Sequence, residues 1–398
     1  MSRSFWVGFD VGKASHWVCV LDGEGERLLS RRVEATETDI HAALSEIEKL
    51  CAPLGERMVG LDLTGGPATL LEALLLERGE RVFRVSGIAV NHAREAYVGG
   101  ERKSDAGDAR IIADQLRLRW KQLPEMHLPD EHLAELRVFV SHRRDLIQDN
   151  VRRIVRLRAL LSGLFPGLEA ALDLTKQSQL LVVTKVATPA AARQLGEARL
   201  YRWLKARGVR KADDLARRII MAAKGQRHEL PAARAKATLV AEIASEVLRT
   251  KQRIAALEGR LEELLSGIPE AAIIRTLPGM GACLTAEFLA EASDLERFGS
   301  ADRLAAAAGI APVLRASGGS VHQRRAKRGN RVLKRVFYQS AFCSLISSEA
   351  SRAFYERKRK EGKAHKQAVV ALARRRVNVL WAMLRDGRAY EEQASEAA

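Results

Sequence analysis

The chain has 398 residues, with 66 Lys and Arg against 49 Asp and Glu, so its formal net charge is +17. This length exceeds what one ordinary core holds and predicts two or three domains. Hydrophobic residues make up 47% of the chain, which excludes a largely disordered protein, and no apolar run of about 18 residues occurs that would predict a membrane span.

The first part of the chain predicts a mixed α/β domain, which we place at residues 1–125. Two segments with helical spacing begin at Thr36 and Ala68, and a third helix begins near Asp105. Five short apolar runs are typical of strands: FWVGFDV, HWVCVLD, RLLSRRVEA, RMVGLDL and ERVFRVS. Three successive strands followed by alternating helices and strands predict a mixed sheet that opens with a three-stranded meander.

The middle of the chain, residues 126–268, predicts long coiled-coil helices. Apolar residues recur at a spacing of three and four in two segments, and they are Leu133, Leu136, Val140, Ile147, Ile154, Leu157, Leu161 and Leu164, then Val240, Ile243, Val247, Ile254, Leu257, Leu261 and Leu264. Arg143 and Asn150 interrupt the first segment and could fix its register. Pairing between subunits and pairing within one chain both stay open. Residues 165–232 predict an elaborated tip between the two arms.

The last part of the chain, residues 269–398, predicts an all-helical domain broken by glycine turns. Between residues 303 and 348 it contains no Asp or Glu but nine Lys and Arg. A generally basic composition would not concentrate cations in one segment. This distribution therefore predicts a face that binds a polyanion such as nucleic acid.

The cysteines give no sign of a metal site or a disulfide framework. The four of them, Cys19, Cys51, Cys283 and Cys343, are far apart, and no CxxC motif occurs. The N-terminal segment MSRSFWVGFDVGK lacks the features of a secretory signal. We expect a protein of a reducing cytoplasm.

Four aspartates form the first candidate site. Asp10 and Asp62 end two predicted strands, so their carboxylates meet at one sheet edge if those strands are neighbours. Asp105 and Asp108 are three residues apart near a helix start and share one helical face. Converging carboxylates repel one another unless a cation lies between them, and Mg²⁺ prefers such oxygen ligands. Each aspartate also has an ordinary interpretation, with Asp105 as a helix N-cap and Asp108 as a favourable first-turn charge.

Two further candidates lie in the last part of the chain. The turn LPGMG, with Gly279 and Gly281, could direct backbone N–H groups at a phosphate, or could simply join two helices. Ser317 stands in a glycine-flanked loop, where its hydroxyl could attack phosphorus, and Ser320 competes for that role. The cations that follow could bind phosphates, and they are Arg324, Arg325, Lys327, Arg328, Arg331, Lys334 and Arg335.

Five segments, in order, resemble those of one known family. They are FWVGFDVGKASHWVCVLD, MVGLDLTGG, ERKSDAGDARIIADQL, LPGMGACLTAEFLAE and FGSADRLAAAAGIAPVLRASGGSVHQRRAKRGNRVLKR. Together they resemble the insertion-sequence transposases that join a RuvC-like DEDD domain to a C-terminal domain bearing a catalytic serine. Piv-type invertases and bridge-RNA recombinases are relatives. The resemblance covers both ends of the chain but not residues 165–232.

The resemblance implies a fold and a set of roles. The N-terminal domain would be RNase H-like, with Asp10, Asp62, Asp105 and Asp108 as ligands of Mg²⁺ or Mn²⁺. Ser317 would attack DNA and form a phosphoserine link. The family usually has Glu at the position of Asp62, so the side chain of this ligand is one methylene shorter here.

The resemblance also implies partners. Donor and target DNA would pair with a structured guide RNA, and the subunits would form a homodimer or homotetramer that combines one subunit's acids with another's serine. The protein would act in the bacterial cytoplasm, at the nucleoid, with no membrane association.

The sequence thus favours a DNA recombinase of a mobile element over two alternatives. A nuclease that resolves DNA junctions would share the acids and use water in place of Ser317. A basic coiled-coil scaffold for nucleic acid would use the acids only structurally. Metal-dependent strand cleavage separates the enzymes from the scaffold, and a covalent protein–DNA product separates the recombinase from the nuclease.

Overall fold

The computed structural model describes residues 4–51, 55–95, 103–127, 130–292, 295, 298–317, 320–324 and 326–392. The chain divides into two compact units, Met1–Asp130 and Glu131–Ala398. The finer division into three domains stays a prediction.

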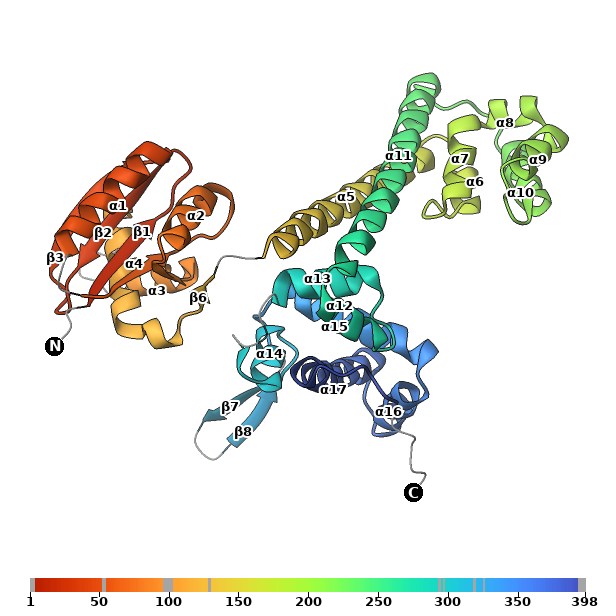
Figure 1. Ribbon diagram of the computed structural model, residues 1–398. Helices are drawn as coiled ribbons and strands as arrows, with labels where there is room; N and C mark the ends of the chain where they lie inside the picture. The colour runs from red at the N-terminus through yellow and green to blue at the C-terminus, as the bar shows by residue number, and fades with distance from the viewer. Residues whose placement is uncertain are drawn as a thin grey trace. The chain divides into compact units, whose positions relative to one another are not determined.

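The N-terminal unit contains the predicted mixed sheet (Figure 1). Its strand order is β3-β2-β1-β4-β5-β6, and the strands are β1 (Phe5–Asp10), β2 (Ser15–Leu21), β3 (Arg27–Glu34), β4 (Arg57–Leu61), β5 (Arg81–Arg84) and β6 (Glu125–Met126). β1, β2 and β3 form the expected antiparallel meander, and β1 runs parallel to β4. The sequence did not predict β6, because a strand of two residues has no periodicity.

Helices cover the two faces of this sheet. They are α1 (Glu37–Cys51), α2 (Thr69–Glu77), α3 (Gly87–Glu95) and α4 (Asp105–Arg119), with 3₁₀ turns at Gly66–Ala68 and Trp120–Gln122. Phe5, Val7 and Phe9 pack with α1 and α2, whereas Trp6 packs with α4, as the alternation of strand side chains requires. α4 lies so close to β1 that a Cβ atom on Gly8 would be 2.3 Å from a backbone oxygen of α4.

The second unit begins with two long helices that pack against each other, α5 (Glu131–Ser162) and α11 (Ala233–Ser266). Arg143 on α5 donates to Glu258 on α11 at 2.9 and 2.6 Å, so this interrupting residue links the two arms. The structure thus shows pairing within one chain. Near the middle of the arms, Ile254 and Leu257 are only partly buried.

The tip folds around its own core (Figure 1). Its helices are α6 (Pro166–Ala171), α7 (Gln177–Lys185), α8 (Pro189–Leu195), α9 (Glu197–Lys205) and α10 (Ala212–Gly225). Leu161 and Val240 join this core from the two arms, so the tip is packed onto the far end of the helical pair.

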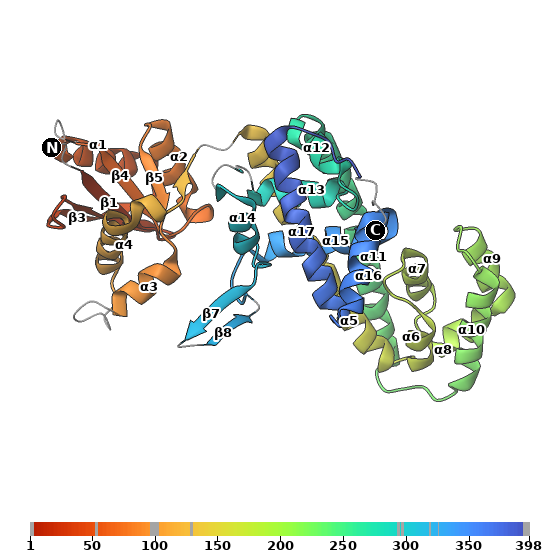
Figure 2. The same cartoon turned by 90° about the horizontal axis from the view of Figure 1, so that it is seen from below.

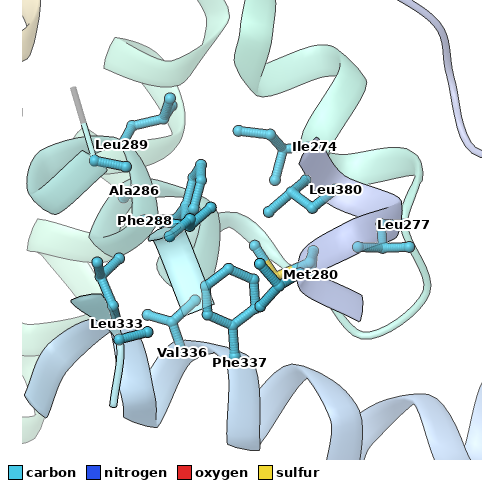
Figure 3. Packing of buried hydrophobic residues seen from close by; sticks show 14 of the residues in the cluster. Ile274, Leu277, Met280, Ala286, Phe288, Leu289, Leu333, Val336, Phe337 and Leu380 are labelled. Carbon is cyan, nitrogen blue, oxygen red and sulfur yellow. The ribbon is translucent and has the colours of Figure 1, made fainter. Parts of the chain in front are cut away.

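The last part of the chain packs around a second core, at the other end of the arms (Figure 2). It contains α12 (Pro269–Thr276), α13 (Ala282–Ala292), α14 (Ala301–Ala307), β7 (Val313–Ser317), β8 (Ser320–Arg324), α15 (Arg331–Ser347), α16 (Glu349–Lys360) and α17 (His365–Asp386). Figure 3 shows Phe288 and Phe337 within this core, where their rings meet edge to face at 5.8 Å between centroids.

The prediction that this last part is all-helical was wrong. β7 and β8 form an antiparallel hairpin in which Ser317 pairs with Ser320. The sequence predicted a loop here because the segment is rich in glycine and serine and its two strands are only five residues long.

No helix among the described residues is both long and apolar enough to cross a membrane.

Candidate functional site

Asp10 and Asp62 lie at the ends of neighbouring strands, as the sequence predicts. β1 and β4 are parallel and Phe9 is in register with Leu61, so the next residue of each strand is an aspartate at the same sheet edge. The backbone N–H of Val11 donates to Asp62 Oδ1 at 3.1 Å. This bond ties the end of one strand to the side chain of the other.

Asp105 and Asp108 both lie in the first turn of α4. The N-cap is Ser104, whose hydroxyl oxygen accepts from the backbone N–H of Gly107 at 3.1 Å, so the interpretation of Asp105 as the N-cap was wrong. Asp105 is exposed, whereas Asp108 is buried. Gly8 lets α4 approach β1 closely enough to bring its first turn toward the sheet edge.

The electrostatics of Asp10 and Asp62 reflect burial and neighbouring acids. Burial, and after it the charges of Asp62, Asp108 and Asp105, together raise the pKa of Asp10 to about 7, against an opposing effect of Lys103. Burial also raises the pKa of Asp62, although backbone N–H groups that donate to its carboxylate oppose the shift. The four predicted acids therefore share one electrostatic environment.

Asp108 has a partner that the sequence did not reveal. Arg94, at the end of α3, donates to the two oxygens of Asp108 from Nε and Nη2, at 2.8 and 2.7 Å. The side chains of Arg94 and Asp108 are only 17% and 6% exposed. A lone arginine in a short helix carries no sequence signal, because its contact depends on how α3 packs on α4.

The four acids suit a hard divalent ion in their chemistry. Within the described ranges, no three His, Cys, Asp or Glu side chains are grouped so that they could hold a metal ion together. The Arg94 guanidinium engages both oxygens of Asp108, so this carboxylate is paired with a cation of the protein itself. The raised pKa of Asp10 shows that burial and the neighbouring acids disfavour its charged form.

The candidate serine lies at the end of the β7–β8 hairpin. The backbone of Ser317 closes β7 and that of Ser320 opens β8, in register with each other. The side chain of Ser317, and the whole of Gly318, Gly319 and Arg325, lie outside the described residues.

The predicted phosphate-binding cations fall into two groups. Four are exposed and have no ion pair among the described residues, and they are Arg324, Lys327, Arg328 and Arg331. The other two described ones have partners within the fold. Lys334 donates to the Gly309 carbonyl at 2.8 Å, and Arg335 pairs with the buried Glu287.

The LPGMG turn packs inside the domain. Gly279 has φ of +81°, and a Cβ atom there would lie 2.5 Å from the backbone oxygen of Ser340. The buried Arg376 donates to the Pro278 carbonyl and to Ser340 Oγ, and burial lowers its pKa to about 10. Packing against α15 thus accounts for glycine at 279, while Gly281 is exposed and no atom crowds it.

Comparison with known proteins matches two transposase family models. A DEDD-type transposase model matches residues 7–166, and the model of the IS116/IS110/IS902 transposase family matches residues 271–356. The first match spans all four candidate acids and indicates use of a divalent metal ion. The second spans the glycine turn, the hairpin and the exposed cations.

Full-length relatives agree with these matches. The chain is 41% identical to the 42 kDa protein of insertion element IS900 from Mycobacterium paratuberculosis, with both chains fully covered. It is 42% identical to the 44.8 kDa protein of IS116 from Streptomyces clavuligerus, over 97% of this chain and 96% of the relative, and 34% identical to the 43.6 kDa protein of IS110 from Streptomyces coelicolor, over 98% and 96%. The chain therefore belongs to the IS116/IS110/IS902 family of insertion-element transposases, which are DNA-recombining enzymes.

Proposed function

We propose that this transposase cuts and rejoins DNA with two sets of residues, the aspartates of the N-terminal unit and Ser317 of the C-terminal hairpin. The observation that carries the first set is the shared environment of the acids, in which Asp62, Asp108 and Asp105 all raise the pKa of Asp10. These four carboxylates would hold Mg²⁺ or Mn²⁺, which supplies positive charge for a phosphodiester oxygen.

Arg94 restrains this site. Because it engages both oxygens of Asp108, that carboxylate becomes a metal ligand only when the guanidinium moves away or shares it. Asp62 has one methylene less than the glutamate of the resembling family, and the Val11 N–H that donates to its Oδ1 fixes the orientation of this carboxylate.

The acids are tested by removing their charge singly. Asp105→Asn or Asp108→Asn should abolish Mg²⁺-dependent cleavage of DNA while binding to DNA persists, because the substitution is nearly isosteric. Full activity in both variants would refute the metal site.

Ser317 would act as the nucleophile. Its Oγ would form a bond to phosphorus as the bond from phosphorus to the leaving nucleotide oxygen breaks, with the hydroxyl proton passing to a base and the leaving oxygen gaining a proton. Arg324, Lys327 and Arg328 are exposed close by in the sequence and would stabilise charge on the phosphoryl oxygens.

Mass spectrometry of trapped reactions tests this role. The wild type should carry nucleotide mass on Ser317, and Ser317→Ala should lose the adduct but keep DNA binding. Ser320→Ala, at the position that faces Ser317 in the hairpin, should retain the adduct. Cleavage by Ser317→Ala without an adduct would favour a nuclease that uses water.

Binding should depend strongly on salt, because phosphate contacts dominate it. Neutralising Arg324, Arg325, Lys327 and Arg328 together should reduce the slope of log affinity against log salt by about 0.9 per lost phosphate contact. An unchanged slope would place the DNA-binding face elsewhere.

A structured guide RNA and a second subunit complete the proposal. The partly buried Ile254 and Leu257, in the middle of the arms, leave apolar surface that another subunit could cover. Ile254→Lys with Leu257→Lys should give a smaller species by light scattering. A wild type that is already monomeric when bound to nucleic acid would contradict subunit pairing through the arms.

The guide RNA has a separate test, which is to sequence the RNA that co-purifies with the protein.

A further inference from the structure

The tip carries a dense group of cations that no role above uses. Residues 165–232 contain 13 Lys and Arg but six Asp and Glu. Six cations lie between Glu197 and Asp213 with no acid among them, all of them exposed, and we call them the tip cations: Arg199, Arg202, Lys205, Arg207, Arg210 and Lys211. Such a cluster repels itself in the absence of a polyanion.

The tip cations lack carboxylate partners among the residues that the structure describes. Within the described part of the chain none of the six forms an ion pair. Arg199 and Arg207 donate only to nearby backbone carbonyls, those of Gln194 and Trp203. By contrast, Arg335 in the C-terminal domain is paired with an acid of the fold. The tip cations therefore keep their charge available for an external anion.

The aromatic residues beside the tip cations are already occupied. Arg207 lies over the Trp203 ring at 4.2 Å and Lys205 over the Tyr201 ring at 5.7 Å, and both rings pack against the tip core. Recognition of unpaired bases needs open aromatic faces. Rings that support cations instead favour contact with a phosphate backbone.

The arms separate this surface from the C-terminal domain. Ala233 belongs to the tip core and Leu265 to the C-terminal core, at the two ends of α11. At 1.5 Å per residue, the helix between them spans about 48 Å. This distance corresponds to about 14 base pairs of duplex DNA at 3.4 Å each.

We propose that the tip cations form a second DNA-binding surface, which holds the phosphate backbone of duplex DNA away from the catalytic residues and without reading its sequence. The inference rests on the chain acting on DNA, but not on the metal site or on Ser317.

Binding of the full-length chain to random-sequence duplex DNA, measured in EDTA, tests the proposal independently of catalysis. The variant replaces Arg199, Arg202, Arg207 and Arg210 by Gln. Losing four phosphate contacts should lower the slope of log affinity against log salt by about 3.6. When salt rises from about 50 to 200 mM, the affinity of the variant should therefore fall by about 10²-fold less than that of the wild type. The effect should be large on a duplex of about 40 base pairs and small on one of about 12, which is too short to span the arm.

Two controls make the outcome decisive. Arg152→Gln with Arg260→Gln removes exposed charges that Asp149 and Glu263 already pair, and it should change the slope little. Replacing the four tip arginines by Lys keeps the charge and should preserve the wild-type slope, whether or not the Gln variant folds well. An unchanged slope in a folded Gln variant, a loss of slope in the Lys variant, or a loss confined to single-stranded RNA would overturn the proposal.

Discussion

The ion pair between Arg94 and Asp108 offers the sharpest test of how the acids are organised. The change is Arg94→Gln, which keeps much of the side-chain volume but removes the charge. Removing one partner of a buried ion pair costs about 3–5 kcal/mol. Since the Arg94 side chain is 17% exposed and water can reach it, we take the lower end, about 3 kcal/mol.

This magnitude predicts two opposite effects. In EDTA the amides of β1 and β4 should exchange about 10²-fold faster, because Asp108 is left unpaired beside Asp10 and Asp62. With Mg²⁺ present, the variant should bind metal more tightly than the wild type, by up to about 10²-fold, because the guanidinium no longer competes for Asp108. Isothermal titration measures the affinity, and hydrogen exchange with mass spectrometry measures the local stability.

Arg57→Gln provides a matched control in the same unit. Arg57 pairs with Glu80 at 2.7 Å, with side chains 25% and 14% exposed, away from the four candidate acids. It should lose stability while its affinity for Mg²⁺ stays at the wild-type value. Equal metal affinity in the Arg94 variant and the wild type would refute the competition between guanidinium and metal.

Three further predictions follow from the packing and the charges. Gly279→Ala should destabilise the C-terminal domain by about 3 kcal/mol or more in urea unfolding, since it combines a positive φ with a clash at Ser340, whereas Gly281→Ala should be nearly neutral. Because the folded pKa of Asp10 is raised from 3.8 to about 7, its contribution to stability is complete below about pH 4 and is lost as pH rises through 7. In EDTA, the free energy of unfolding of Asp10→Asn relative to that of the wild type should therefore be higher at pH 8 than at pH 5. The same difference at both pH values would contradict the raised pKa. Gly8→Ala should push α4 from β1 and weaken Mg²⁺ binding together with stability, and wild-type metal affinity would show that this close approach is unnecessary.

The sequence predicted those features that depend on local pattern. Asp10 and Asp62 could be placed at one edge because each ends an apolar run, and parallel neighbouring strands bring such ends together. The heptad spacing located both arms. In each case the signal lies within a few residues of the feature itself.

Features that depend on packing between distant segments could not be predicted. Arg94 contacts Asp108 because α3 packs on α4. Glycine is needed at 279 because the backbone of α15, a helix distant in the sequence, lies too close for a Cβ atom. The β7–β8 hairpin escaped notice since its strands are short and its turn is rich in glycine and serine. Whether pairing of the arms is internal could be decided only by the fold.

Among the described residues, the tip and the C-terminal domain have separate hydrophobic cores, and residues of the paired arms contribute to both. Each core can therefore open and close as a cooperative unit of its own. The tip enters after Ser162 and leaves before Ala233, at the same end of the helical pair, so its two chain ends are neighbours. An insertion with adjacent ends can be exchanged for a short helical turn without disturbing the register of the arms. The tip is thus a module that relatives of this transposase could vary in size, or lose, while the catalytic parts of the chain stay intact.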